Sequence, residues 1–149
     1  MLRITTIALG LAMISAPLAV ADDGWIEKTS PHTVADTTAK LTAAVENAGA
    51  RVFAVVDHAA GAESVEMELA PNTAVIFGNP RVGTPLIQAN PLMGYELPLR
   101  VLIWDDGGTT KVGYRDPAAV AAAYDVDAAE AVAMAAGAID NLTGAAIAP

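Results

Sequence analysis

The chain has 149 residues, a formal net charge of −9 at pH 7 and no cysteine. Without cysteine it forms no disulfide, performs no thiol chemistry and offers no thiolate ligand to a metal. An acidic surface repels phosphate backbones and anionic lipid headgroups, so the composition argues against nucleic acid and membrane surfaces as partners.

Residues 1–21 have the pattern of a secretory signal peptide. A short basic start precedes an apolar run over residues 4–20, and Ala19-Val20-Ala21 gives a small-x-small cleavage pattern. We therefore expect cleavage after Ala21, a periplasmic or secreted product, and no stable membrane anchor after cleavage. A retained anchor is the alternative, although Pro17 interrupts the apolar run. Residues 22–149 are then long enough for a single domain with its own core.

The first half of this domain predicts strands on either side of one long helix. Alternation predicts a strand over residues 24–29, with Trp25 and Ile26 on opposite faces. Apolar residues at helical spacing predict a helix over residues 33–48, which Gly49 ends. A β-branched run predicts a strand over residues 51–56, and residues 57–64 form either a loop or one to two helical turns.

The middle of the chain predicts three more strands. Val65, Met67 and Leu69 alternate with glutamates, so residues 65–69 are predicted as a half-buried strand. Apolar runs predict buried strands over residues 73–77 and 97–104. The latter forms a hairpin with residues 110–115, because Asp105-Asp106-Gly107-Gly108-Thr109 is typical of a turn.

Short helices are expected around these strands and at the end of the chain. Thr84 followed by Pro85 predicts an N-cap and a helix over residues 85–89. Another helix is expected over residues 118–124, and an acidic capping box at Asp127 opens a last helix that runs to about residue 142. Strands segregated from helices predict an α+β domain, with a mostly antiparallel sheet and helices packed on one face.

The stretch from Phe77 to Leu86, FGNPRVGTPL, carries a resemblance to a known family. It closely resembles the signature of the bacterial family called domain of unknown function 302. Asp57-His58, Ala62, Tyr114 and Pro117 also fall where that family's pattern places them. The resemblance covers nearly all of the chain after residue 24. It implies a curved sheet with a β-α-β(4)-α topology similar to that of the TATA-binding protein, and a homodimer like those attributed to relatives.

His58 is the main candidate for chemistry, because it follows a buried strand, where pockets open. Its imidazole could accept a proton, bind a ligand oxygen or coordinate a metal. The alternative is a ring that bonds a backbone carbonyl and holds the loop. His32 is the other histidine, so one chain cannot build a three-histidine zinc site. Methionines such as Met67 could complete a copper or haem site with His58, or could simply fill the core.

The FGNPRVGTP loop is the second candidate region. Asn79, Arg81 and Thr84 could contact a small polar molecule at the lip of a pocket. The alternative is a structural loop, in which Asn79 caps or turns the chain and Thr84 caps the next helix. Two prolines remove N–H donors that a phosphate nest needs, and neither a Walker pattern nor GxGxxG is present.

The sequence thus predicts an exported, non-catalytic domain that binds a small ligand, copper or haem near His58 and the FGNPRVGTP loop, and it identifies no cofactor. The ligand-binding candidates are His58, Asn79, Arg81, Thr84 and Tyr114, with His58 also the metal ligand. Two alternatives stay open. One is a hydrolase or isomerase that uses His58 as general base, although no GxSxG motif is present. The other is a structural module that self-associates through its sheet.

Overall fold

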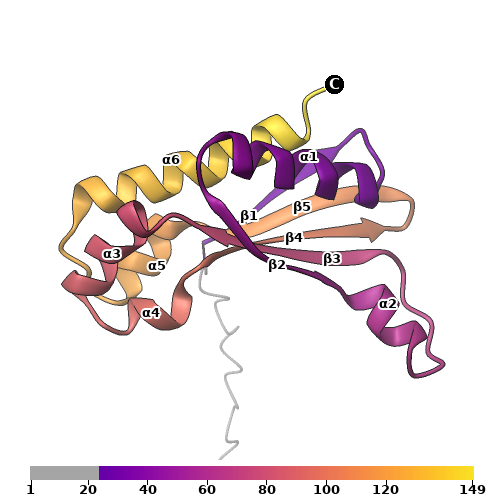
Figure 1. Ribbon diagram of the computed structural model, residues 1–149, viewed down its shortest axis with the longest axis horizontal. Coiled ribbons are helices and arrows are strands. Elements are labelled where there is room, and N and C mark those ends of the chain that lie inside the picture. Colours follow the sequence, from indigo (N-terminus) through magenta and orange to yellow (C-terminus); the bar gives the residue numbers. More distant parts are fainter. Residues whose placement is uncertain (1–23) are drawn as a thin grey trace, which may run out of the picture.

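The computed structural model describes residues 24–149, so the expected signal peptide and its cleavage site lie outside the described residues. Within this part of the chain, five strands form one antiparallel sheet in the order β1-β5-β4-β3-β2. The strands are β1 (Trp25–Ser30), β2 (Arg51–Asp57), β3 (Asn72–Gly78), β4 (Leu99–Asp106) and β5 (Thr109–Arg115). The sheet is curved, and its edges are β1 and β2 (Figure 1).

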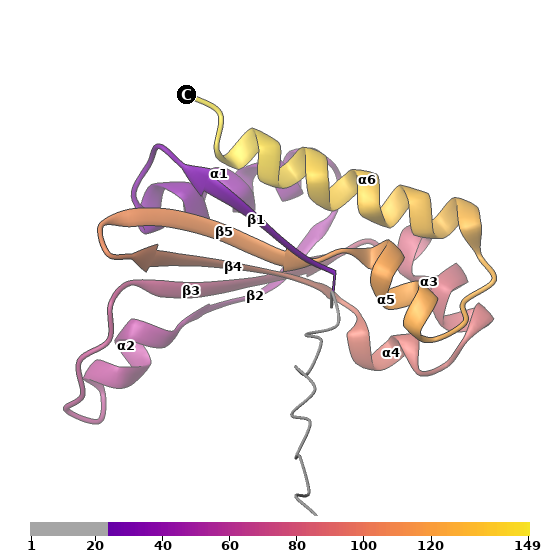
Figure 2. The same cartoon turned by 180° about the vertical axis from the view of Figure 1, so that it is seen from behind.

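Helices cover one face of this sheet and gather at one of its ends. The long helices α1 (Val34–Asn47) and α6 (Ala129–Ala146) lie side by side over the same face, as both views show (Figures 1 and 2). The short helix α2 (His58–Glu63) follows β2 at one end of the sheet. At the other end lie α3 (Pro80–Ala89), α4 (Met93–Glu96) and α5 (Pro117–Ala123). The predicted α+β class and β-α-β(4)-α order are confirmed, with short helices inserted.

The main core fills the space between the sheet and the two long helices. Residues that alternate along each strand point to this side, which is why the apolar positions are two apart. Leu41, Val45, Val75, Val101, Ile103 and Val112 are fully buried in it. A second, smaller cluster joins α3, α4, α5 and the start of α6 through Leu86, Met93, Val120, Ala131 and Ala135. This second cluster forms the inner wall of the site described below.

The strand predicted at residues 65–69 is not formed. Residues 64–70 run through turns and irregular backbone, and Glu66 has a positive φ of 61°, which extended strands do not allow. Val65, Met67 and Leu69 are exposed by 63%, 65% and 51% of their surface. The alternating pattern is present in the sequence. Among the described residues, however, no strand pairs with this segment.

Two helices begin at different residues from those expected. The helix α3 begins at Pro80, because the Asn79 side chain accepts a hydrogen bond of 3.0 Å from the Arg81 N–H and Pro80 needs no donor there. Thr84 is therefore inside α3 and is not an N-cap. The helix α6 begins after Ala128 without a side-chain cap, so the capping box expected at Asp127 is not formed.

Candidate functional site

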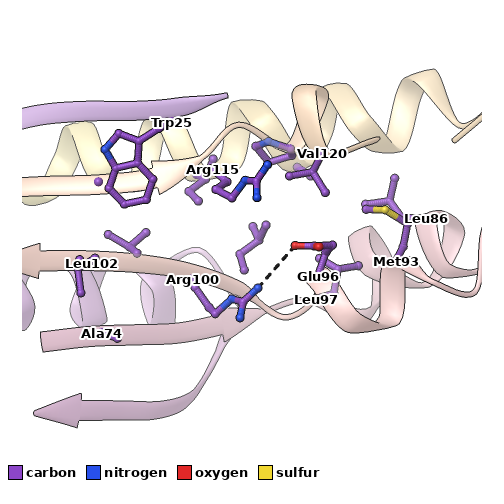
Figure 3. A pocket seen from close by; sticks show the side chains of 16 residues that line it. Trp25, Ala74, Leu86, Met93, Glu96, Leu97, Arg100, Leu102, Arg115 and Val120 are labelled. Atoms are coloured by element: carbon purple, nitrogen blue, oxygen red, sulfur yellow. Dashed lines mark ion pairs between the residues drawn. The ribbon is translucent and has the colours of Figure 1, made fainter. Parts of the chain in front are cut away.

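The sheet splits between its strands β4 and β5. Their shared register runs from Asp106 and Thr109 to Leu102 and Gly113 and ends there. Beyond that point β4 continues along β3, while β5 continues along β1. A cavity of about 320 Å³ lies at the split, with Leu102 and Arg100 on one strand and Arg115 on the other (Figure 3). The cavity arises because β4 stays paired with β3 and β5 stays paired with β1 after their pairing with each other ends.

The inner wall of this cavity is apolar. It is formed by residues of α3, α4, α5 and α6 and of the segment between α4 and β4: Leu86, Met93, Leu97, Val120, Ala135 and Ile139. Most of these side chains belong to the second core cluster, so their positions are held by packing behind the cavity. A molecule in the cavity would meet a wall without hydrogen-bonding side chains.

Polar groups meet only at the mouth. Arg100 and Arg115 come from the two separated strands, and the Glu96 carboxylate lies between them (Figure 3). The Arg100 Nη2 atom lies 3.6 Å from Glu96 Oε2, an ion pair with Arg100 55% exposed and Glu96 15% exposed. The Tyr124 hydroxyl donates a hydrogen bond of 2.9 Å to Glu96 Oε1. This bond to Glu96 is the main reason the pKa of Tyr124 is raised, while nearby Arg115 lowers it.

Two indoles form a shelf beside the mouth. Trp25 and Trp104 lie on the sheet face opposite α1 and α6, with ring centroids 6.2 Å apart and ring planes at 44°. Both rings lie over Gly113, where an added Cβ would overlap the Trp25 ring and come within 2.9 Å of Trp104 Cζ3. Trp25 lines the cavity and is 43% exposed. Glycine at position 113 is therefore what allows this aromatic surface beside the cavity.

A second hollow of about 250 Å³ lies next to the first. It is lined by Phe53, Ile87 and Pro98 and by the start of α3, including Asn79 and Thr84. Leu97, Leu99 and Ala135 line both hollows. Leu97 is thus part of a thin wall between two apolar spaces.

The model of the family Domain of unknown function DUF302 matches residues 26–146. The chain belongs to the DUF302 family. A crystal structure of an uncharacterized conserved DUF302 protein from Bacillus stearothermophilus has the same fold, with a TM-score of 0.68 at 18% identity over 83% of this chain and 95% of that one.

Two curated relatives of this DUF302 chain carry the name fluoride-specific ion channel FluC 1, from Brucella suis and Brucella abortus. Each is 38% identical over 116 residues, or 77% of this chain. Those residues make up 46% and 43% of the two proteins, so the chain spans less than half the length of either relative. Within residues 24–149, none of the helices combines the length and the apolar character needed to cross a bilayer.

Asn79, Arg81 and Thr84 lie at the second hollow of the DUF302 domain or beside it. Asn79 and Thr84 line that hollow, whereas Arg81 is exposed in the first turn of α3. Asn79 also caps α3, which is the structural role considered for it. Two of these three side chains therefore line a hollow, and a binding role for them stays a prediction.

Tyr114 is separated from these residues. It is 2% exposed and faces α6, where its hydroxyl donates a bond of 3.2 Å to Asp140 Oδ1. Burial is the main reason its pKa is raised, and the Lys28 ammonium opposes that shift. The position supports the core of the DUF302 domain, on the opposite face of the sheet from Trp25.

His58 is also separated from the FGNPRVGTP loop. It is exposed as the first residue of α2, which Asp57 caps by accepting a bond of 3.0 Å from the Ala60 N–H. In the β2–β3 register Asp57 pairs with Thr73 and Arg51 pairs with Gly78, so His58 and Asn79 lie at opposite ends of these strands. At about 3.3 Å per residue the separation is roughly 20 Å. The expected single cleft that contains His58 and Asn79 is not formed. The antiparallel strands β2 and β3 run in opposite directions, so the residues that follow them lie at opposite ends of the sheet.

No metal centre is evident around His58 within the part of the chain that the structure describes. There, no group of three or more His, Asp or Glu side chains is placed to hold a metal ion. The binding role of His58 stays a prediction.

Glu96, Arg100 and Arg115 were not singled out from the sequence. One signal was present, because Arg100 interrupts the otherwise apolar run from Leu99 to Trp104. A single charge in a strand is common, however, and nothing in the sequence shows that β5 leaves β4 beside it.

Proposed function

We propose that this DUF302 domain is an exported, non-catalytic module that binds one small, mostly apolar molecule in the cavity between β4 and β5. The observation that supports this is the division of the cavity into a packed apolar wall and a mouth where polar groups converge. Ligand sites are typically apolar hollows of about 300–1,000 Å³ with a few polar groups that fix orientation. The volume of about 320 Å³ places this cavity at the small end of that range.

The energy of such binding comes from the wall. A ligand that fills the space between Leu86, Met93 and Ile139 removes apolar surface from water and supplies the contact atoms that an empty hollow lacks. The wall is held by helix packing, so little of that energy is spent on ordering the site.

The chemistry of the lining supports binding over catalysis. The described residues that line this cavity include no Ser, Thr, Cys, His or Lys. Glu96 is the lining residue that could act as a base, but its two oxygens already face the Tyr124 hydroxyl and Arg100. The hydrolase or isomerase alternative needs His58, which is remote from this mouth along the β2–β3 register.

A fluorescent probe tests the proposal. The neutral dye N-phenyl-1-naphthylamine should bind the residue 24–149 domain saturably at one site. Ala135→Met should weaken binding strongly, because Ala135 lines both hollows and is 1% exposed. Ala133→Met is the matched control, since it makes the same change at an exposed position of α6. Equal dye binding by both variants would sink the proposal.

The metal and haem expectations are tested in the same way. Copper, zinc and haem are added to the wild-type domain and to His58→Ala, and thermal stability is measured. A stabilisation that His58→Ala removes would support the predicted site at His58. Lack of any shift would end that expectation and leave the cavity proposal as it stands.

Self-association is a second candidate role, favoured by the exposed segment at residues 64–70, which we call the acidic arm. Its apolar side chains Val65, Met67 and Leu69 alternate with Glu66 and Glu68. The open face of the sheet carries Arg51, Arg100, Lys111 and Arg115, although Glu27 pairs with Lys111 and Glu96 pairs with Arg100 there. Charge complementarity therefore suits the arm of one copy to the open face of a second copy.

Light scattering tests this second role. We expect a dimer at micromolar concentration that Met67→Ser with Leu69→Ser converts to a monomer. A matched control is Met134→Ser with Leu92→Ser, which removes exposed apolar side chains elsewhere. A wild-type domain that stays monomeric would end the idea.

A further inference from the structure

We infer that two copies of the chain associate with their edge strands β2 antiparallel, and that the acidic arm of each copy docks on the second hollow of the other. This inference rests on the self-association proposed above and adds the surface that receives the arm. It does not depend on a ligand in the cavity between β4 and β5.

The first argument is that β2 is an unprotected edge of the sheet. Edge strands usually carry charged side chains or prolines, which prevent pairing with another chain. The other edge strand, β1, follows this rule with Glu27 and Lys28 at its centre. In β2 every residue between the two ends is apolar, including Phe53, Val55 and Val56, which are 49%, 47% and 38% exposed. An apolar edge of this kind favours a partner that covers it.

The second argument is that β2 is complementary to an antiparallel copy of itself. Arg51 begins the strand and Asp57 ends it. A two-fold axis near the middle of β2 brings the Arg51 end of each copy to the Asp57 end of the other, whereas a parallel arrangement brings like charges together. The register of β2 shifts beside Phe53, so we expect side-chain contacts along this edge more than a continuous backbone ladder.

The third argument is where the arm and the second hollow lie along β2. The arm follows α2 beyond the Asp57 end of the strand, whereas Phe53, near the other end, lines the second hollow (Figure 1). One copy cannot bring the arm and the hollow together, because the length of β2 separates them. Two antiparallel β2 strands place each arm beside the hollow of the other copy, so the same contact is made twice.

The arm is already ordered in a single copy. The Val65 and Met67 N–H groups donate to the Ala62 carbonyl oxygen over 3.1 and 3.0 Å, and the Glu66 N–H donates to the Glu63 carbonyl oxygen over 3.0 Å. These bonds hold the arm against α2 while its apolar side chains stay exposed. Docking therefore spends little free energy on ordering the arm.

The polarity of the second hollow matches the middle of the arm. Phe53, Ile87 and Pro98 give the hollow an apolar lining, and its volume is about 250 Å³. Met67 is 65% exposed, and its unbranched thioether side chain adapts well to such a space. We therefore expect Met67 to enter the hollow of the second copy.

The charges beside the second hollow also match the arm. The Arg51 Cζ atom lies 5.4 Å from the centroid of the Phe53 ring, and Arg81 is in the first turn of α3, which borders the hollow. Among the described residues, neither of these two arginines is in an ion pair. Both can therefore pair with Glu66 and Glu68 of the arriving arm.

Disulfide trapping tests the docking directly, because the chain has no cysteine of its own. The double variant Met67→Cys with Ile87→Cys should form a covalent dimer under mild oxidation, seen by non-reducing electrophoresis. Each single variant should stay uncross-linked, because the two-fold axis keeps identical positions apart. The matched control is Met67→Cys with Thr109→Cys, in which the second cysteine is exposed on β5, three strands away from β2.

The result of the trapping decides where the arm lies. No covalent dimer in the Met67→Cys, Ile87→Cys protein, or equal cross-linking in the Thr109→Cys control, would overturn docking on the second hollow.

Charge reversal tests the pairing of the arm with Arg51. Arg51→Glu should weaken the dimer, and adding Glu66→Lys with Glu68→Lys in the same chain should restore it. Asp106→Lys with Asp125→Lys is the matched control, since it restores the same net charge at exposed positions outside the arm. Equal recovery with both pairs would show an effect of net charge and would overturn this pairing.

A lysine on the edge tests the role of β2. Val55→Lys places two ammonium groups near the two-fold axis, so the dissociation constant of the dimer, measured by analytical ultracentrifugation, should rise more than about tenfold. Thr29→Lys, at an exposed position of the other edge strand, should leave it unchanged. An unchanged constant for Val55→Lys would overturn the β2 interface.

The outcomes separate this inference from the self-association on which it rests. A dimer that Val55→Lys leaves intact, or that traps no disulfide between positions 67 and 87, would overturn the docking and leave self-association standing. A wild-type protein that stays monomeric would overturn both.

Discussion

Lys28 and Asp140 join the edge strand of the sheet to its longest covering helix. The Lys28 ammonium lies 2.7 Å from Asp140 Oδ1, 3.0 Å from the Asp140 carbonyl oxygen and 2.8 Å from Thr143 Oγ1. The Tyr114 hydroxyl donates to the same Asp140 oxygen. The Lys28 side chain is only 19% exposed, so its ammonium needs acceptors within the protein. The three acceptors on α6 match its three N–H donors. This group of hydrogen bonds therefore links β1 and β5 to α6.

Acid should weaken this connection. The hydrogen bond from Lys28, then its charge, then the bond from Tyr114 lower the pKa of Asp140. A lowered folded-state pKa means that the ionised form contributes fully above the unfolded value of about 4, and that this stability is lost as pH falls through the folded pKa. Asp140→Asn should unfold at lower urea concentration at pH 7 and lose less stability between pH 5 and pH 2.

The control for this prediction is Asp106→Asn, a change at an exposed carboxylate at the end of β4. It should match the wild type in both the urea midpoint and the acid dependence. Parallel loss of stability with acid in wild type and Asp140→Asn would contradict the assignment of the effect to this carboxylate.

Tyr114 should prove to be a stability residue. Tyr114→Phe removes the hydroxyl bond to Asp140 and should cost about 1 kcal/mol of unfolding free energy at pH 7. Burial raises the pKa of Tyr114, so the protonated phenol's contribution is present below the unfolded value of about 10 and is lost as pH rises through the folded pKa. Wild type should therefore converge on the variant in alkaline urea titrations. Reduced dye binding by a fully folded variant would instead place Tyr114 at the ligand.

The sequence predicted the layers of the fold well, for a simple physical reason. A strand or helix buried on one side must repeat its apolar residues with the period of that element, so α1 and the β4–β5 hairpin could be located within a residue or two. The same rule was wrong at residues 65–69. The alternation is present there, but the described chain places no strand beside this segment. A pattern shows that a segment can pair, and the partner has to come from the fold.

The candidate site was harder to predict because it depends on contacts between distant residues. Glu96 and Tyr124 are 28 residues apart, and their hydrogen bond follows from how α4 and α5 meet at the end of the sheet. The cavity itself forms where the pairing of β4 with β5 ends, beyond Leu102 and Gly113. Conversely, His58 and Asn79 both follow strands, but antiparallel strands carry them to opposite ends.

Asn79 should contribute mainly as a helix cap. Asn79→Ala removes the acceptor for the Arg81 N–H and should lower the unfolding free energy by about 1 kcal/mol, whereas Asn79→Asp should retain it. Asn141→Ala, the same change on the exposed side of α6, should be neutral or slightly stabilising because alanine is the better helix former. Chemical denaturation of the three variants is the measurement. If Asn79→Ala were as stable as wild type, the Asn79 cap would contribute nothing to the unfolding free energy.

Gly113 should be the glycine least tolerant of a side chain. An alanine Cβ there would overlap the Trp25 ring and crowd Trp104, so Gly113→Ala should cost about 1–3 kcal/mol by overpacking. Gly137→Ala is the contrasting control, since nothing lies within 4 Å of its Cβ position in α6, and it should stabilise the domain by about 0.5–1 kcal/mol.

A double variant shows whether the indole is the cause. Trp25→Ala removes the ring that the new methyl group would strike, so Gly113→Ala should cost much less in that background, a coupling that urea titration of all four proteins measures. Equal costs in both backgrounds would mean that the Trp25 ring is not what requires glycine at this position. Because Trp25 lines the cavity, a displaced indole should also change dye binding, which links the packing at this glycine to the mouth of the site.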